Sequence, residues 1–194
     1  MKKYFIFRIK HGLLLLAIIM VLPLIVSAQN LIMARAADAT GLDPHTQTAF
    51  ASLRLLELIY EPLVVLDEKL NIDPALAESW SFSSDGKVLT FQLRKGVTFH
   101  DGSKMTAKDV IASFKRILDE KTGAATRANF LSIQTIEEQG QNTVVFHLSR
   151  PDVPILTAMT DTNASIISSD IISNGNPSQK AIGTGPFVLN SWSP

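Results

Sequence analysis

Residues 74–118, "PALAESWSFSSDGKVLTFQLRKGVTFHDGSKMTAKDVIASFKRIL", carry the pattern that decides the fold. Apolar and polar residues alternate over residues 80–82 and again over residues 89–93, with the pair Asp85–Gly86 between the two runs. Such alternation places every second side chain on one face of a strand, and Asp–Gly is a preferred tight turn. The sequence therefore predicts an antiparallel hairpin, and the alternation continues to Phe99.

After "HDGSKM" (100–105) the apolar spacing changes to that of a helix. Thr106 is a preferred N-cap residue, and Asp109 can complete a capping box with it. A carboxylate in the first turn also favours the positive end of a helix. The apolar stripe consists of Val110, Ile111, Phe114, Ile117 and Leu118, and the opposite stripe of Lys108, Asp109, Lys115, Arg116 and Asp119. We therefore expect a turn at Asp101–Gly102 followed by a capped amphipathic helix.

Further strand signals lie on both sides of this stretch. Single strands are expected at residues 31–35, 63–67 and 164–168. A second hairpin is expected over residues 132–148, with the turn "QGQN" at its centre. "GTGPF" (183–187) predicts a tight turn that feeds a strand.

Helical spacing recurs in two other places. One helix is expected from Ala49 to Glu61, because Pro62 would terminate it. A short helix is expected near residues 153–160, and residues 68–79 are expected to connect elements. Strands and helices are thus interspersed, without internal repeats, which indicates an α/β class of the mixed α+β kind.

The first 28 residues have the three parts of a secretory signal peptide. A basic start precedes the apolar run Leu13–Val26, and small residues follow up to Ala28. We expect cleavage after Ala28, which leaves residues 29–194 as one domain. The alternative is a membrane anchor, although the apolar run is shorter than the roughly 20 residues that span a bilayer. Because Gln29 stands where a lipoprotein needs a cysteine, we expect a soluble exported product, periplasmic in a Gram-negative bacterium.

The charge balance limits the classes of partner. Of 18 basic residues, four precede the expected cleavage site, so 14 basic residues face 18 acidic ones in the mature chain. An acidic balance of about −4 without a basic patch argues against nucleic acid as a partner. The chain has no cysteine, so an exported product must rely on its core rather than on disulfides.

The pair His100–Asp101 is the first candidate for chemistry. Metal hydrolases use such pairs but add further ligands, and the mature chain has only two other histidines, at no ligand spacing. Of these, His45 follows Asp43–Pro44 in a predicted loop, and His147 lies on the outer face of a predicted strand. A structural role for His100 and Asp101, in a turn before a capped helix, is therefore favoured, and no metal or cofactor is expected.

Other motifs give no support for catalysis. "GTGPF" lacks the patterns of a P-loop and of a dinucleotide fold, so a turn is favoured over a phosphate-binding loop. The chain has no GxSxG serine, and its carboxylates show no obvious pair for glycoside hydrolysis. Aromatic side chains could stack on a ligand, but a core position is favoured for Trp80, Phe82, Phe91, Phe99 and Phe114.

Five pieces of the sequence together resemble a known family. They are "LDPH" (42–45), "IYEPLVVLD" (59–67), residues 74–118, "TVVFHLSRPDVPIL" (143–156) and "AIGTGPFVLNSW" (181–192). In this order they resemble the family 5 bacterial extracellular solute-binding proteins, the periplasmic oligopeptide-, dipeptide- and nickel-binding components of ABC importers.

The resemblance implies a non-enzymatic receptor of two lobes that closes on its ligand by a hinge. Family members are longer, so this chain is expected to be the N-terminal lobe with an inserted hairpin-and-helix subdomain, without the second lobe. The expected ligand is a small peptide, the expected partners are permease subunits of the inner membrane, and the expected state is a monomer. Alone, the chain is expected to bind weakly, because half of the cleft would be missing.

The resemblance also places candidate ligand-binding residues. The loop "PHTQTAF" (44–50) is expected to face the cleft with Thr46, Gln47, Thr48 and Phe50, and "MTDTNAS" (159–165) with Asp161 and Thr162. For each of these residues, an ordinary structural role in a loop or helix cap is an equally favoured alternative. Nickel, sugar or another small solute is the alternative ligand. Two further alternatives are a secreted hydrolase that uses His100 and Asp101, and an exported scaffold without a ligand.

Overall fold

The computed structural model describes residues 32–193. The expected signal peptide, residues 1–28, lies outside the described residues. Residues 32–35 form neither helix nor strand and are exposed, so the strand expected at 31–35 is wrong where it is described. No helix within residues 32–193 is long and apolar enough to cross a membrane.

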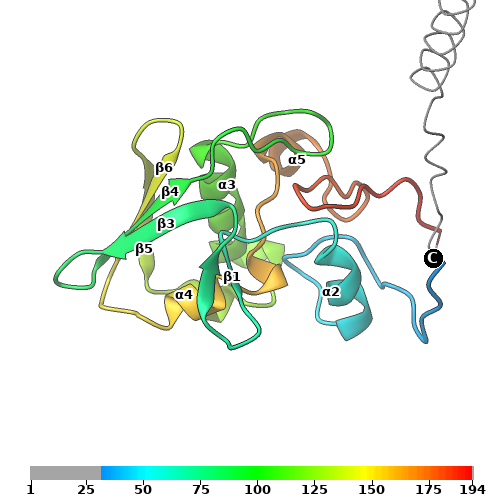
Figure 1. The fold of residues 1–194 in the computed structure, drawn as a ribbon, viewed down its shortest axis with the longest axis horizontal. Helices are drawn as coiled ribbons and strands as arrows, with labels where there is room; N and C mark the ends of the chain where they lie inside the picture. Colours follow the sequence, from blue (N-terminus) through cyan, green and yellow to red (C-terminus); the bar gives the residue numbers. More distant parts are fainter. Residues whose placement is uncertain (1–31, 194) are drawn as a thin grey trace, which may run out of the picture. The chain divides into compact units, whose positions relative to one another are not determined.

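A four-stranded antiparallel sheet is the centre of the fold (Figure 1). Its strands are β3 (Ala77–Phe82), β4 (Val88–Leu93), β5 (Ile133–Glu138) and β6 (Thr143–Leu148), in the order β3-β4-β6-β5. The first hairpin pairs Trp80 with Phe91, and β6 joins the two hairpins by pairing Val144 with Phe91. Both predicted hairpins are confirmed. The predicted extension to Phe99 is not a strand, since only Thr98 forms a bridge, to Lys104.

Helix α3 (Ala107–Leu118) lies against β5 and β6 and covers one face of the sheet (Figure 1). Its predicted capping box is confirmed, because the backbone N–H of Thr106 donates to the Asp109 carboxylate at 2.8 Å. The other oxygen of Asp109 accepts from the backbone N–H and the hydroxyl of Ser169, each at 2.8 Å. Ser169 begins α5 (Ser169–Asn174), so one carboxylate joins the starts of two helices.

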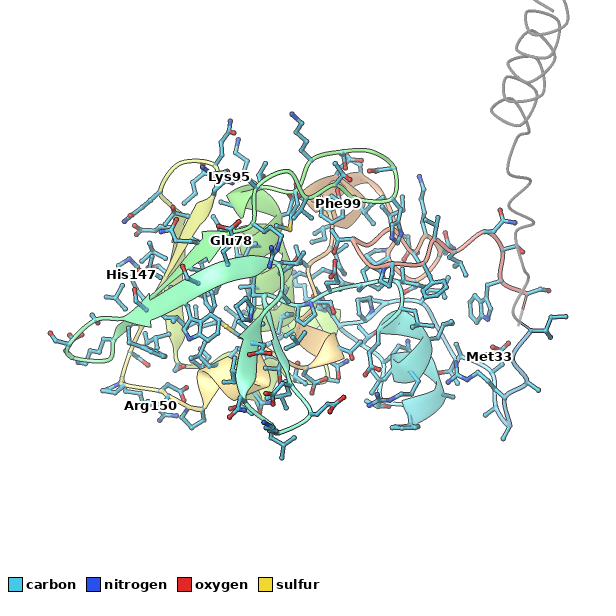
Figure 2. All side chains as sticks on the ribbon, viewed as in Figure 1. Met33, Glu78, Lys95, Phe99, His147 and Arg150 are labelled. Atoms are coloured by element: carbon cyan, nitrogen blue, oxygen red, sulfur yellow. The ribbon has the colours of Figure 1, made fainter. Side chains whose placement is uncertain are left out.

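Side chains fill the space between α3 and the sheet (Figure 2), and aromatic rings contact one another there. The ring of Phe114 meets the rings of Phe130 and Phe146 edge to face, at centroid distances of 5.3 and 5.1 Å. Phe91 and Phe99 are also buried, whereas Trp80 and Phe82 are partly buried against the same core. The predicted core position is therefore confirmed for Phe91, Phe99 and Phe114, whereas Trp80 and Phe82 only pack against the core.

Helix α2 (Phe50–Leu56) is shorter than the helix expected from Ala49 to Glu61. The backbone N–H groups of Ile59 and Tyr60 both donate to the carbonyl of Leu56, which closes the chain into turns before Pro62. The predicted strand at 63–67 is confirmed as β1 (Val64–Leu66). It pairs with β2 (Ile72–Pro74), within the stretch that was expected only to connect elements. Three residues are too few to show a period.

The last third of the described chain contains little regular structure. Helix α4 (Ile155–Ala158) confirms the short helix, and a 3-10 turn (Thr162–Ala164) follows it. The strand expected at 164–168 is absent, because its N–H groups find other partners: Ile166 bonds to the carbonyl of Glu61 and Ile167 to the hydroxyl of Ser113. Residues 187–193 form no strand after the "GTGPF" turn.

Candidate functional site

His100 fastens the "GTGPF" turn to the turn that precedes α3. Its Nε2 atom donates to the carbonyl of Gly185 at 2.8 Å, and its Nδ1 atom accepts from the N–H of Gly183 at 3.4 Å. A backbone carbonyl can only accept and a backbone N–H can only donate, so these bonds fit the neutral ring with its proton on Nε2. The backbone N–H of His100 also donates to the carbonyl of Gly183.

Asp101 stabilises its own turn. Its carboxylate accepts from the backbone N–H and the hydroxyl of Ser103, at 3.0 and 2.6 Å. The hydrogen bond from the Ser103 hydroxyl, followed by the one from the Ser103 backbone, holds the pKa of Asp101 below its usual value. His100 and Asp101 thus have separate structural partners. Within residues 32–193 no three His, Cys, Asp or Glu side chains gather to hold a metal ion.

Gly183 and Gly185 lie flush against the chain segment that follows α2. A Cβ atom on Gly183 would fall on the carbonyl group of Ile59, and one on Gly185 would come within 2.7 Å of the same peptide group. The N–H of Gly185 donates to the Ile59 carbonyl at 2.9 Å. Close backbone approach, rather than phosphate binding, accounts for these two glycines.

A buried charged cluster lies where the sequence predicted a simple loop. Arg116 donates to both carboxylate oxygens of Asp43, at 3.0 and 2.5 Å, and to Nδ1 of His45 at 2.9 Å. Nε2 of His45 is 2.9 Å from the carbonyl of Ser165. The side chains of Asp43 and Arg116 are 2% and 17% exposed. Of the residues that the sequence placed on the polar stripe of α3, Asp109 is therefore buried and Arg116 is largely buried.

The environment of His45 keeps its ring neutral. Burial lowers its pKa from 6.5 to about 4, and the positive charge of Arg116 lowers it as well, against the opposing effects of the Ser165 carbonyl and of Asp43. The two hydrogen bonds of the ring agree with this direction, because Nδ1 accepts from Arg116. The ring therefore acts as a neutral link between the guanidinium and the backbone.

The four candidate residues of the loop lie at or near the surface beside this cluster. Thr46 and Gln47 are partly exposed, Thr48 is exposed, and Phe50 is 71% exposed at the start of α2. The guanidinium of Arg54 lies 4.8 Å from the centre of the Phe50 ring. The carbonyl of the Gln47 side chain accepts from Thr40 at 2.9 Å.

Asn163 joins this loop to the second candidate segment. Its side-chain nitrogen donates to the carbonyls of Pro44 and Gln47, at 2.5 and 2.9 Å. Asp161 and Thr162 immediately precede it in the chain, so the structure brings both predicted segments together. The two residues point to different places, however. Thr162 lines a hollow of about 470 Å³, whereas Asp161 lines another of about 530 Å³.

The hollow beside Thr162 lies between the end of α2, β1 and residues 160–165. The Thr162 hydroxyl donates to Glu57 at 3.0 Å, and Glu57 accepts from Arg54 at 2.7 Å. Ser165 also lines the hollow, and its hydroxyl has no hydrogen-bond partner within the described chain. The hollow is thus polar on the α2 side, where the cation–π pair of Arg54 adjoins it.

A family profile matches residues 71–194, more than half of the chain, and is described as bacterial extracellular solute-binding proteins, family 5 middle region. The chain belongs to this family. Its match begins at the start of β2 and includes both hairpins, α3 and the "GTGPF" turn. The family resemblance seen in the sequence is therefore confirmed.

Named relatives of this family 5 chain include binding proteins from several bacteria. A "probable D,D-dipeptide-binding periplasmic protein" of Escherichia coli K12, DdpA, is 32% identical over 84% of this chain and 33% of its own length. AgaA of Agrobacterium tumefaciens R10, solved with agropinic acid, is 34% identical with a TM-score of 0.76 over 80% of this chain and 32% of that one. DppA of Helicobacter pylori, solved with a peptide, is 34% identical with a TM-score of 0.70 over 81% and 36%. The chain spans about a third of the length of these relatives.

Sequence reasoning missed Arg116 and Asn163, the two side chains that hold the loop of this family 5 chain. Arg116 follows Lys115 on a charged stripe, so nothing in the local pattern separated it from a surface cation. Asn163 stands in "DTN", which is typical of a turn. Their partners lie more than 70 residues away in sequence.

Proposed function

We propose that this chain is the solute-contacting part of an extracytoplasmic receptor that delivers small peptides to an ABC transporter permease. The ligand contacts the loop of residues 46–50 and the segment of residues 161–162. The family consists of solute-binding proteins, and among the similar proteins DdpA is named for D,D-dipeptides and DppA was solved with a peptide.

One observation carries the proposal most strongly. Two segments, separated by more than 110 residues in sequence, are joined through the hydrogen bonds of Asn163 to the carbonyls of Pro44 and Gln47. Thr162, in the second segment, lines a hollow together with Arg54 and Glu57 of the α2 region. A rigid frame with exposed polar groups and one exposed aromatic ring at its edge suits the capture of a polar solute without chemistry.

The receptor breaks no bond in its ligand. His100 and Asp101 support this view, because each is engaged with a backbone or serine partner. A hydrolase that used this pair would need the imidazole free to accept a proton. Here both ring nitrogens are used to hold the "GTGPF" turn.

The test is a titration followed by NMR. We would express residues 1–194 in a bacterial host, purify the exported ¹⁵N-labelled chain, and add an equimolar tripeptide mixture. Because the chain spans about a third of its relatives, we expect millimolar affinity and shifts confined to residues 44–50 and 160–165. Parallel titrations with sugars and with nickel–histidine test the alternative solutes. Absence of shifts with every solute, or shifts centred on His100, would overturn the proposal.

The same preparation tests the export route. We propose that residues 1–28 are removed and that a soluble monomer remains in the periplasm. Mass spectrometry of the exported chain is expected to find Gln29 at its N-terminus, and light scattering to give the mass of one chain. An unprocessed N-terminus in the membrane fraction would contradict this part of the proposal.

A further inference from the structure

The loop of residues 43–48 has little regular structure of its own. Residues 44–46 form a single turn, and the N–H of Thr46 bonds to the carbonyl of Asp43 at 3.3 Å. Yet Asp43, Pro44 and His45 are buried, while Thr48 is exposed. The loop is therefore fixed at its base by the protein interior and presents its far end to solvent.

Two interior side chains supply this fixation from different elements. Arg116, on α3, binds Asp43 with both ends of its guanidinium and His45 with one of them. Asn163, beyond α4, spends both of its side-chain N–H groups on the carbonyls of Pro44 and Gln47. Arg116 thus holds the beginning of the loop, and Asn163 holds it at Pro44 and at Gln47, which lies between Thr46 and Thr48.

We propose that Arg116 and Asn163 are positioning residues for ligand capture, which hold the loop of residues 43–48 in its binding geometry without touching the ligand. The inference rests on the proposed function and adds to it a cause of affinity. A loop that is ordered before binding loses less conformational freedom when the ligand arrives, so its affinity is higher. If the hydrogen bonds of either side chain are removed, the loop is less ordered before binding, and the entropy cost of ordering it then lowers the affinity.

Two substitutions that leave no new unpaired charge in the interior are expected to preserve the fold. Arg116→Lys retains the buried positive charge opposite Asp43, but an ammonium cannot form the two-ended contact and reach His45 as well. Asn163→Ala removes both donors and adds no charge. The matched controls are Arg127→Lys, which alters a pair with Glu120 and a bond to the Leu118 carbonyl away from the loop, and Asn174→Ala, which removes an exposed bond to Asp170.

Two measurements separate positioning from general stability. Hydrogen exchange followed by NMR is expected to quicken about tenfold or more at the amides of His45 and Thr46, which donate to Asp43, in either variant, with little change in β4 and β6, because only the loop loses its supports. Titration with the tripeptide mixture is expected to show at least about fivefold weaker binding at a temperature where each variant is folded. The control variants are expected to match the unaltered chain in both measurements.

Each outcome decides between distinct readings. Exchange that quickens equally in the loop and the sheet, with affinity unchanged, would overturn the positioning role and leave a purely structural one. Local loop exchange together with weaker binding supports it. Failure of the unaltered chain to bind any solute would overturn the proposed function and the positioning role with it, whereas the exchange result would still show whether the two side chains order the loop.

Discussion

Nδ1 of His45 lies 2.9 Å from Nη1 of Arg116, where solvent has no access to the imidazole. The ring can accept this hydrogen bond only while it is neutral, since protonation would set two cations against each other beside a single carboxylate, Asp43. The structure thus couples the protonation of one buried ring to the base of the loop that carries the candidate ligand residues.

Stability is expected to fall as the medium becomes acidic, because of His45. Its pKa is about 4 in the folded chain and 6.5 as the ordinary value, so the unfolded chain binds the proton more tightly. The contribution of the neutral ring is complete above pH 6.5 and is lost as the pH falls toward 4, to a total of roughly 3 kcal/mol. Urea unfolding at pH 7 and at pH 4.5 measures the loss.

His45→Gln separates this effect from other acid-sensitive groups. A glutamine amide can still donate to the Ser165 carbonyl but does not titrate. We expect the variant to be less stable at pH 7 and to lose less stability than the unaltered chain between pH 7 and 4.5. His147→Gln, at a half-exposed strand position near Glu137, is the matched control for the substitution itself. Parallel pH profiles for all three chains would contradict the assignment to His45.

The double variant His100→Ala with Asp101→Ala is expected to fold and to retain ligand binding. It removes the imidazole that forms hydrogen bonds with Gly183 and Gly185, together with the carboxylate that stabilises the turn at Ser103. We expect a loss of about 1–3 kcal/mol in the free energy of unfolding, which corresponds to a few hydrogen bonds. Urea unfolding and the NMR titration measure the two properties. A hydrolase centred on this pair predicts the opposite, full loss of function with little change in stability.

Gly183→Ala adds only one methyl group but is expected to reduce the stability of the fold strongly. Its Cβ atom would overlap the carbonyl group of Ile59, which is backbone and has no flexible end that could move away. We expect a loss of at least about 2 kcal/mol, in the range of overpacked sites. Gly175→Ala is the control, because its nearest backbone contact is 3.0 Å and its φ is −116°. Equal thermal stability of the two variants would argue against the close approach.

Phe114→Ala and Phe50→Ala are expected to separate stability from binding. Phe114 is fully buried between Phe130 and Phe146, so its removal should cost about 3–5 kcal/mol. Phe50 is 71% exposed and its removal should change stability by less than about 0.5 kcal/mol. Ligand affinity should nevertheless fall in Phe50→Ala. A change in stability without a change in affinity would remove Phe50 from the candidate site.

Local signals in the sequence predicted the central sheet and its helix. The two hairpins follow from alternation around short turns, and α3 follows from a Thr106–Asp109 capping box with an apolar stripe. Each signal involves residues within a few positions of one another, so it can be recognised in the sequence without knowledge of distant contacts. The same local rule overextended α2, because an apolar spacing up to Tyr60 did not reveal that Ile59 and Tyr60 both bond to Leu56.

The sequence by itself determined the family, the two hairpins and the capped helix, because period, turn and cap are local properties. Only the tertiary structure decided that Arg116 lies inside rather than on the charged stripe, that His45 is buried, and that Asn163 joins two candidate segments. The physical reason is the separation between partners. A carboxylate, an imidazole and two carbonyls become neighbours of these groups only when the chain closes over loops of more than 70 residues, and no local pattern records such a closure.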